Sequence, residues 1–250
     1  MRKTISLLLS AAILVCSLTF ITPVSYAQED EIDKIELNTA YEASFDSDDK
    51  VLNKKDKTYY DVYAFTLECD GKITLIIKSD TKGYLSKYVR YMILDEKSDK
   101  VWSPDNKNFK GKWSVNLKKG KYNFVAVYTK TNDKEGKMLG GSYTFKLAYK
   151  PNVKASEITK LSAAKKGFKA KWKKVKGVTG YQIQYSVKKN FSKSEKIKIK
   201  GAKNLSTAVS ELKAKKKYYV RVRAYQTFTF GEKKKTYYSK WSKAETVKTK

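Results

Sequence analysis

The chain has 250 residues, with 54 Lys and Arg, 25 Asp and Glu and no histidine, so its formal net charge at pH 7 is +29. The absence of histidine excludes Ser-His-Asp and Cys-His triads, histidine-ligated zinc and the commonest general base. A carboxylate pair or a Ser-Lys dyad stays open in principle, but no local motif for either is present. We therefore expect a protein that is not an enzyme and that needs no cofactor.

The N-terminus has the pattern of a secretory signal peptide. Arg2 and Lys3 supply positive charge, residues 5–20 are nearly all apolar, and Ser25-Tyr26-Ala27 offers small residues where a signal peptidase reads them. A retained signal anchor is the alternative, although the apolar stretch is short for a span of about 20 residues. We expect residues 1–27 to be removed. The protein would then be secreted, extracellular or associated with the cell surface, with no transmembrane segment.

Cleavage would leave Cys69 as the only cysteine, so no intrachain disulfide can form. Cys69 lies where a strand is expected to enter the Asp70-Gly71 turn, a dipeptide typical of hairpins. A buried or half-buried thiol is one interpretation, and an intermolecular disulfide is the alternative.

Charge divides the remaining chain into two parts. Residues 28–150 hold 23 basic and 20 acidic residues, whereas residues 151–250 hold 29 basic and five acidic residues, a net charge of +24. Such a field raises the local concentration of anionic partners. Nearly all the basic residues are lysine, so the charge also fits a composition that was not selected for binding. Both interpretations stay open.

Residues 28–150 are predicted to form a β-sandwich or jelly roll, because short strands alternate with turn signals and no 3.6-residue period persists. The expected strands are residues 59–67, 72–78, 88–94, 100–103, 113–117, 122–128 and 143–149.

Three segments of this part resemble the bacterial pre-peptidase C-terminal domain. They are residues 61–65, the run from Leu117 to Tyr122 followed by Phe124, Val125 and Val127, and residues 140–147. That domain is a small jelly-roll module attached to secreted hydrolases and surface proteins. The resemblance implies an accessory role rather than a reaction.

Two features of this part suggest ligands, each with a plain structural alternative. Asp46, Asp48 and Asp49 offer hard oxygen ligands of the kind that calcium prefers, but the EF-hand pattern is absent and a solvated acidic loop is the default interpretation. Trp102 and Trp113 flank a loop and could stack sugars, but aromatic residues also simply fill strands.

Residues 151–250 are predicted to form a second sandwich. Its expected strands are residues 156–163, 167–175, 180–186, a strand around Ile197 and Ile199, 207–212, 218–225, and a last strand that opens with residues 238–242. An alternating ladder runs through Leu212, Ala214, Lys216, Tyr218, Val220, Val222 and Ala224. A period of two places such residues on one face of a strand.

Four motifs in order resemble a fibronectin type III domain: Trp172, the Gly180-Tyr181-Gln182-Ile183-Gln184-Tyr185 strand, the Leu212-to-Tyr218 corner and Tyr238-Ser239-Lys240-Trp241-Ser242. The resemblance implies an immunoglobulin-like sandwich in which the Tyr218 hydroxyl bonds to backbone near Leu212. Ala214 departs from the usual proline, and no Arg-Gly-Asp is present. Residues 226–236 are expected to be a long loop, carrying Phe228, Phe230 and three lysines.

The outward face of the 218–225 strand is the main candidate surface of this second part. Its residues are Tyr219, Arg221, Arg223 and Tyr225, with Gln182 and Gln184 on the same face and Phe228 and Phe230 in the adjoining loop. Interleaved arginine and tyrosine could bind an anionic glycan or nucleic acid by charge pairing and stacking. An ordinary exposed sheet face with cross-strand pairs is the alternative.

The sequence thus predicts a secreted, non-catalytic binding or spacer protein of a Gram-positive-like bacterium. Its expected partner is an anionic cell-wall polymer or polysaccharide, with another surface protein as a second class and no specific nucleic acid. A carbohydrate-binding accessory protein of an extracellular polysaccharide-degrading system, acting through Trp102 and Trp113, is the alternative function.

Overall fold

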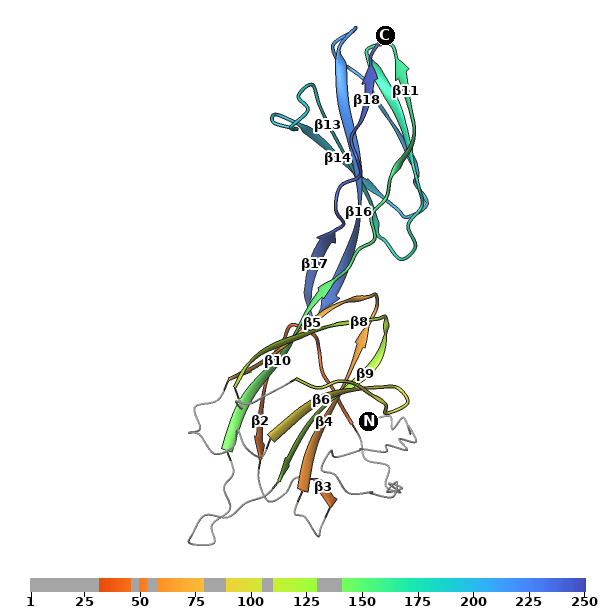
Figure 1. Cartoon of the computed structure of the whole chain (residues 1–250). Coiled ribbons are helices and arrows are strands. Elements are labelled where there is room, and N and C mark those ends of the chain that lie inside the picture. Colours follow the sequence, from red (N-terminus) through yellow and green to blue (C-terminus); the bar gives the residue numbers. More distant parts are fainter. Residues whose placement is uncertain (1–31, 46–49, 54–57, 79–88, 105–109, 130–140) are drawn as a thin grey trace. The chain divides into compact units, whose positions relative to one another are not determined.

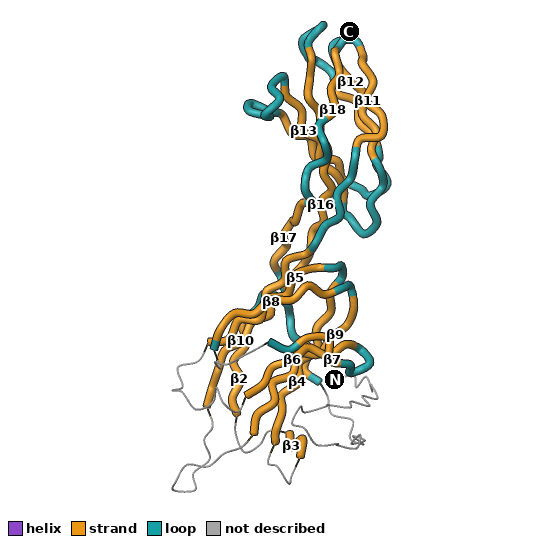
Figure 2. The backbone as a smooth tube through the Cα atoms, in the orientation of Figure 1, coloured by secondary structure: helices purple, strands orange, loops and turns teal. Residues whose placement is uncertain are grey.

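The computed structural model describes residues 32–45, 50–53, 58–78, 89–104, 110–129 and 141–250 (Figure 1). These ranges hold strands, turns and loops and no helix (Figure 2). Within them, no helix is long and apolar enough to cross a membrane. The chain divides into two compact units, Met1–Lys150 and Pro151–Lys250, called unit 1 and unit 2 below. The expected signal peptide and Asp46, Asp48 and Asp49 lie outside the described residues.

Unit 1 is a jelly-roll-like sandwich of two sheets. One sheet has the order β1 (Asp33–Lys34), β4 (Thr58–Leu67), β9 (Gly120–Thr129), β6 (Val89–Asp95) and β7 (Lys100–Trp102), with β3 (Lys50–Asn53) beside β4. The other has the order β2 (Ala40–Phe45), β10 (Gly141–Pro151), β5 (Gly71–Lys78) and β8 (Gly111–Leu117).

The core of unit 1 lies between these sheets and is rich in aromatic rings. In β5, Ile73, Leu75 and Ile77 are buried at alternate positions, as a half-buried strand requires. Phe124 of β9 meets Phe145 of β10 with 5.0 Å between ring centroids, so these rings join one sheet to the other. Strands β6 and β9 also bury their other face, where Met92 and Leu94 pack with Val125 and Val127.

The hairpin expected at Asp70-Gly71 is not formed. Strand β4 pairs with β9 and strand β5 with β8, so the segment between them carries the chain from one sheet to the other. The Asp70 carboxylate accepts a hydrogen bond from the backbone N–H of Lys119 at 3.0 Å, which ties the crossing to a neighbouring turn. The Asp70-Gly71 dipeptide therefore marks the point where the chain turns and crosses to the other sheet, not a hairpin between two adjacent strands.

Unit 2, all of whose residues are described, is a fibronectin type III-like sandwich. Its smaller sheet has the order β11 (Ile158–Ala164), β12 (Gly167–Trp172) and β15 (Ser206–Val209). Its larger sheet has the order β14 (Glu195–Lys200), β13 (Gly180–Ser186), β16 (Lys217–Phe230) and β17 (Lys233–Tyr238), with β18 (Glu245–Lys248) also pairing with β16.

The core of unit 2 follows the alternation of its strands. Phe168, Ala170 and Trp172 are buried on β12, and Val220, Val222 and Ala224 are fully buried on β16. The predicted ladder is wrong upstream of Tyr218, because Ala214 and Lys216 are exposed in a turn where Lys215 has φ 53°. Leu212 is half-buried and packs against this core. The Tyr218 hydroxyl accepts a hydrogen bond from the backbone N–H of Lys213 at 3.3 Å, which gives the expected tyrosine corner.

The long loop expected at residues 226–236 is instead a β-hairpin. Strand β16 continues to Phe230 and pairs with β17 from Gln226 opposite Tyr237 to Phe230 opposite Lys233. Gly231, with φ 56°, begins the two-residue turn. We call this hairpin the β16–β17 arm. Phenylalanine and threonine alternate along residues 227–230 with the period of a strand, but the lysine run at residues 233–235 obscured that period in the sequence.

Candidate functional site

The candidate surface lies on the larger sheet of unit 2, where register brings the predicted side chains together. Gln184 is the cross-strand partner of Arg221, and Gln182 is the partner of Arg223. Arg221 Nε donates to Gln184 Oε1 at 2.8 Å, and Arg223 Nε donates to Gln182 Oε1 at 2.9 Å. A second nitrogen of Arg223, Nη2, reaches the same oxygen at 2.6 Å. Each guanidinium is therefore fixed by an amide on the adjacent strand.

Aromatic rings cover both faces of the two guanidinium groups. The central carbon of Arg221 lies 3.9 Å from the Phe191 ring centroid and 4.7 Å from that of Trp241. The central carbon of Arg223 lies 4.3 Å from the Trp241 centroid and 3.8 Å from that of Tyr238. We call this stack of Phe191, Arg221, Trp241, Arg223 and Tyr238 the cation–aromatic ladder.

A gap between β17 and β18 allows Trp241 to enter the ladder. Residues 239–244 form no strand, yet the edge of β16 there stays hydrogen-bonded through two serines. Ser239 Oγ accepts from the backbone N–H of Ala224, and Ser242 Oγ accepts from that of Val222, both at 3.0 Å. The backbone N–H groups of the same serines donate to the carbonyls of Ala224 and Val222. The serine side chains thus replace ladder hydrogen bonds while the chain bulges.

The ladder places two positive charges in a partly desolvated layer. Burial lowers the pKa of Arg221, and burial together with the charge of Arg221 lowers the pKa of Arg223, while Tyr238 opposes that change. Arginine is still charged at neutral pH, because its ordinary pKa lies above 12. The charges are therefore retained, but the ring faces that would stack a ligand are already used.

The two predicted tyrosines of this face are also occupied by cations. Lys198 Nζ lies 4.5 Å from the Tyr225 centroid, and Lys217 Nζ lies 5.3 Å from that of Tyr219. Tyr225 lies so close over Gly180 that a Cβ there would be 2.7 Å from its hydroxyl. Tyr225 is therefore buried within the packing of this face, whereas Tyr219 is half-buried.

The remaining predicted residues lie apart from the ladder. Phe228 and Phe230 are on the β16–β17 arm, where Phe228 lies 6.1 Å from Phe230 and 5.8 Å from Tyr237 between centroids. Trp102 is half-buried at the end of β7. Trp113 is half-buried in β8, covers Gly111 and lies 6.1 Å from the Tyr91 ring.

Cys69 is a half-buried free thiol. Its Sγ lies 3.3 Å from the Tyr149 hydroxyl, which donates to the Cys69 carbonyl at 2.6 Å. Among the described residues, no group of three or more acidic, cysteine or histidine side chains could hold a metal ion.

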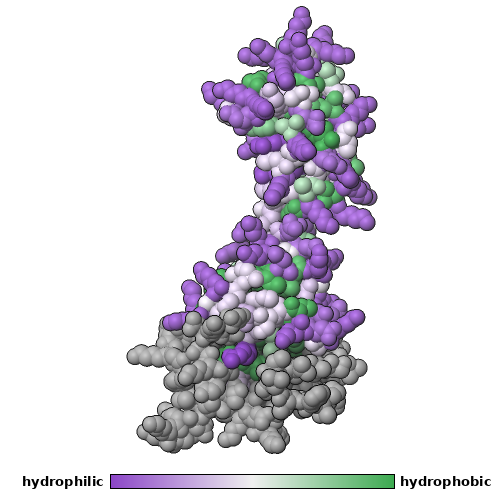
Figure 3. Space-filling view, viewed as in Figure 1, coloured by the Kyte–Doolittle hydropathy of each residue, from purple (hydrophilic) through white to green (hydrophobic). Residues whose placement is uncertain are grey.

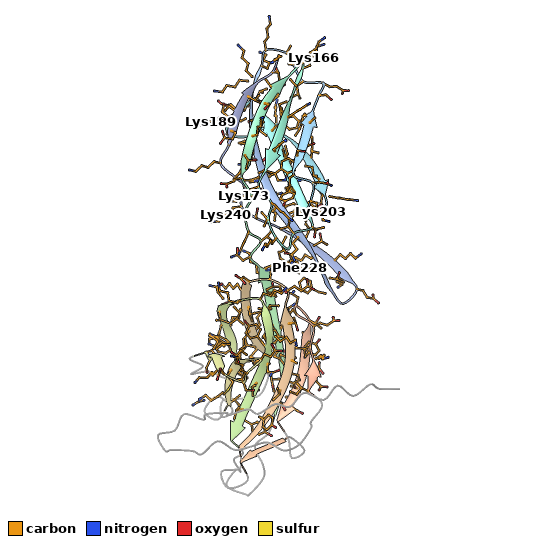
Figure 4. All side chains as sticks on the ribbon, turned by 90° about the vertical axis from the view of Figure 1, so that its right-hand side faces the viewer. Lys166, Lys173, Lys189, Lys203, Phe228 and Lys240 are labelled. Atoms are coloured by element: carbon orange, nitrogen blue, oxygen red, sulfur yellow. The ribbon has the colours of Figure 1, made fainter. Side chains whose placement is uncertain are left out.

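Lysines surround unit 2 with few acidic partners. Within its 100 residues, all of them described, one ion pair is formed, between Lys173 and Glu157 at 3.3 Å. Hydrophilic side chains cover much of the visible surface of this unit (Figure 3). Lys166, Lys189 and Lys203 lie at separate places around it (Figure 4). The positive charge is thus distributed over the unit and largely uncompensated.

Sequence reasoning missed Phe191 and the ladder role of Trp241 and Tyr238. Phe191 lies in the loop between β13 and β14 with φ 58°, and Trp241 lies in the irregular segment before β18. Strand periodicity cannot place residues of such segments. The available signal was the Tyr-Ser-x-Trp-Ser motif itself, whose two serines and Trp241 all contact the outward half of β16.

The fold is that of an all-β protein with two sandwich units. No family model matches the chain, and no curated protein matches it by sequence. It is similar to a solved β-1,2-glucanase from Parabacteroides distasonis, with 11% identity over 77% of this chain and 30% of that chain and a TM-score of 0.32. It spans less than a third of that glucanase.

Two further solved structures show a comparable degree of likeness. PliG, a periplasmic inhibitor of g-type lysozyme from Aeromonas hydrophila, is 9% identical over 48% of this chain and 98% of that chain, with a TM-score of 0.30. The FN1–FN3 domains of chicken CNTN1 are 14% identical over 87% of this chain and 65% of that chain, with a TM-score of 0.34. The likeness extends to a β-rich fold and no further.

Proposed function

We propose that this is an exported, non-catalytic protein that binds an anionic wall or extracellular polymer at a bacterial cell surface. Unit 2 is its fibronectin type III domain and makes the contact. The observation that carries the proposal is the charge of unit 2: 29 basic and five acidic residues with a single internal ion pair. Like charges left unpaired at this density destabilise a fold by repulsion, and an anionic partner would relieve that repulsion.

Unit 1 has a different part in this proposal. Its sandwich is close to neutral in charge and is the module that resembles the pre-peptidase C-terminal domain, so we assign it an accessory or spacing role. The signal-peptide pattern of residues 1–27 supports export, which would bring unit 2 to polymers outside the cell.

The test is co-sedimentation of the purified chain, expressed from Gln28, with isolated Gram-positive walls over a range of salt concentrations. Binding through lysines should weaken steeply as salt rises, because counterions compete with the protein for the polymer charges. Walls stripped of anionic polymers, and a neutral polysaccharide, serve as controls. Binding that does not change with salt, or equal binding to stripped walls, would contradict the proposal.

The same assay separates the carbohydrate-binding alternative. Trp102 is the residue to change, since Trp113 also packs on Gly111 and Tyr91 and its loss would disturb the sandwich. If the unaltered protein binds a neutral glycan and Trp102→Ala abolishes that binding, the binding site lies in unit 1 and acts by aromatic stacking.

A further inference from the structure

Strand β14 carries a row of three exposed lysines at alternate positions: Lys196, Lys198 and Lys200. Alternate residues of a strand point to the same face, so these three side chains share the outward face of the larger sheet. Their Cα atoms are spaced by about 6.8 Å, twice the rise of an extended residue. We call them the β14 lysine row.

The row has no acidic neighbour on its face. Its cross-strand partners are Gln184, Gln182 and Gly180. Glu195, at the start of the strand, lies at an odd position and so points to the opposite face from the lysines. It pairs with Tyr185, whose pKa is raised by burial and by the charge of Glu195. The comparable run on β12 differs, because Lys173 at its end pairs with Glu157. Positive charge on the β14 row is therefore not neutralised by an acidic side chain, although Lys198 Nζ lies 4.5 Å from the Tyr225 ring centroid.

Register places the two arginines of the ladder in line with this row. Lys196, Gln184 and Arg221 are consecutive partners across three strands, and Lys198, Gln182 and Arg223 are the next set. Strands lie about 4.8 Å apart, so each lysine Cα lies about 9.6 Å from that of its arginine. The lysines along β14 and the arginines along β16 both recur every two residues. The face thus presents two lysine–arginine pairs one dipeptide apart, while Lys200 lies in line with Gly180 and Tyr225.

We propose that this face binds a polyphosphodiester whose charges recur every six backbone bonds, of which 1,3-linked polyglycerol phosphate is the simplest. This rests on the function proposed above and names its ligand. Two residues of extended protein also span six backbone bonds, or about 7 Å at ordinary bond lengths. An extended polymer of this repeat laid along β13 meets one lysine and one arginine at each of two successive phosphates, and Lys200 at the next.

The held arginines make this arrangement more than a loose cluster of charge. Nε of Arg221 and Arg223 is bonded to glutamine and the guanidinium faces are stacked, so little rotamer entropy remains to be lost on binding. The guanidinium donors that do not bond to glutamine, Nη1 of both arginines and Nη2 of Arg221, can donate to phosphate oxygens. The flexible lysines then supply the second charge for each phosphate.

The first test uses the unaltered protein and changes only the ligand. Synthetic oligomers of glycerol phosphate and of ribitol phosphate with the same number of charges have repeats of six and eight backbone bonds. We expect at least about tenfold tighter binding of the glycerol oligomer at equal salt, since a tenfold change equals about 1.4 kcal/mol, close to the loss of one hydrogen bond to a charged group. Equal affinity for the two oligomers would overturn the spacing match.

The second test compares two variants of unit 2, each of which loses three positive charges from a different sheet. K196Q/K198Q/K200Q removes the β14 lysine row, whereas K160Q/K169Q/K171Q removes three exposed lysines from the smaller sheet. Glycerol phosphate binding should fall at least about tenfold in the first variant and less than about threefold in the second, with salt dependence reduced mainly in the first. Circular dichroism and thermal unfolding show whether both variants are folded.

The outcomes distinguish this inference from the proposed function. Equal losses in both variants would mean that net charge alone drives binding, which overturns the site and leaves the function standing. No binding of the unaltered protein to any polyanion would overturn both.

Discussion

Unit 1 and unit 2 differ in where part of their aromatic residues lie. In unit 1 the rings lie between the sheets, where Tyr63, Phe124 and Phe145 have centroids 4.7–6.2 Å apart. Unit 2 also buries Phe168 and Trp172 in its core, but a second set of rings gathers on the outer face of its larger sheet against arginine and lysine. The first arrangement stabilises by removing rings from water, and the second by placing them on cations.

The cause lies in what alternates with the aromatic residues. Along β16, Val220, Val222 and Ala224 fill the inward positions, so Arg221 and Arg223 are left outside with the rings that cover them. Along β10, Tyr143, Phe145 and Leu147 are themselves the buried set. Aromatic residues therefore contribute to the core of both units, and in unit 2 a second set of them also builds an ordered charged surface.

The comparison predicts its largest effect for a ring inside unit 1. Phe124 is fully buried and contacts rings of both sheets, so Phe124→Ala should cost unit 1 about 3–5 kcal/mol of its unfolding free energy. Denaturant unfolding of the full chain, followed by hydrogen exchange for each unit, measures this loss. Phe168→Ala is the matched control, since Phe168 is as deeply buried in unit 2. If either variant lowered the unfolding free energy of both units, the assignment of each ring to the core of its own unit would be contradicted.

Alkaline pH should separate the units next. Burial raises the pKa of Tyr91, of Tyr143, and of Tyr149, which also bonds to Cys69, all in unit 1. Folding therefore favours their neutral form, and this stability is complete below pH 10 and is lost as pH rises through the raised pKa values. Each such tyrosine costs about 1.4 kcal/mol per pH unit above a reference pKa near 10.

Unit 2 should lose less over the same range. Burial raises the pKa of Tyr185 and of Tyr225, so fewer tyrosines with raised pKa values oppose folding at alkaline pH in unit 2 than in unit 1. Denaturant midpoints between pH 8 and 11.5, with the transition of unit 1 assigned through Phe124→Ala, test the order. If unit 2 unfolds first as pH rises, the buried tyrosines do not set the order of unfolding.

Much of this contrast could be predicted from alternation, and the part that could not lies in loops. The strand sets around Trp172 and from Tyr218 to Ala224 have a clear period of two, and the structure places them as that period requires. Phe191 and Trp241 have no such period, because their positions depend on a positive φ and on two serine side chains that replace backbone pairing. The outward row was thus predicted, but the rings that cover it were not.

The ladder should contribute less than a buried ring. Trp241→Ala removes one ring from two guanidinium groups, and we expect unit 2 to lose about 1–3 kcal/mol from cation–π contact and lost apolar burial. Trp241→Phe, which keeps a flat ring, should recover part of that loss. Chemical denaturation at low and high salt is the measurement. No change in either variant would show that the stack forms without stabilising the unit.

The smallest predicted effect concerns a hydrogen bond between a tyrosine hydroxyl and the backbone, which occurs in both units. Tyr122 in unit 1 and Tyr218 in unit 2 each follow a turn and bond to backbone four or five residues upstream. The Tyr122 hydroxyl donates to the Lys118 carbonyl at 3.0 Å, whereas the Tyr218 hydroxyl accepts from the Lys213 N–H at 3.3 Å. Replacing either by phenylalanine should cost about 0.5–1.5 kcal/mol, the net value of one such bond.

The two substitutions should nonetheless respond differently to pH. Burial, with the charges of Asp95 and Asp70, raises the pKa of Tyr122, and its bond to the Lys118 carbonyl requires the hydroxyl proton. Ionisation above pH 10 removes that donor, so the cost of Tyr122→Phe should shrink there. Tyr218 accepts its hydrogen bond from the Lys213 N–H, so that bond does not depend on a hydroxyl proton and the cost of Tyr218→Phe should persist. Parallel stability curves for the two variants from pH 8 to 11 would contradict the difference in donor direction.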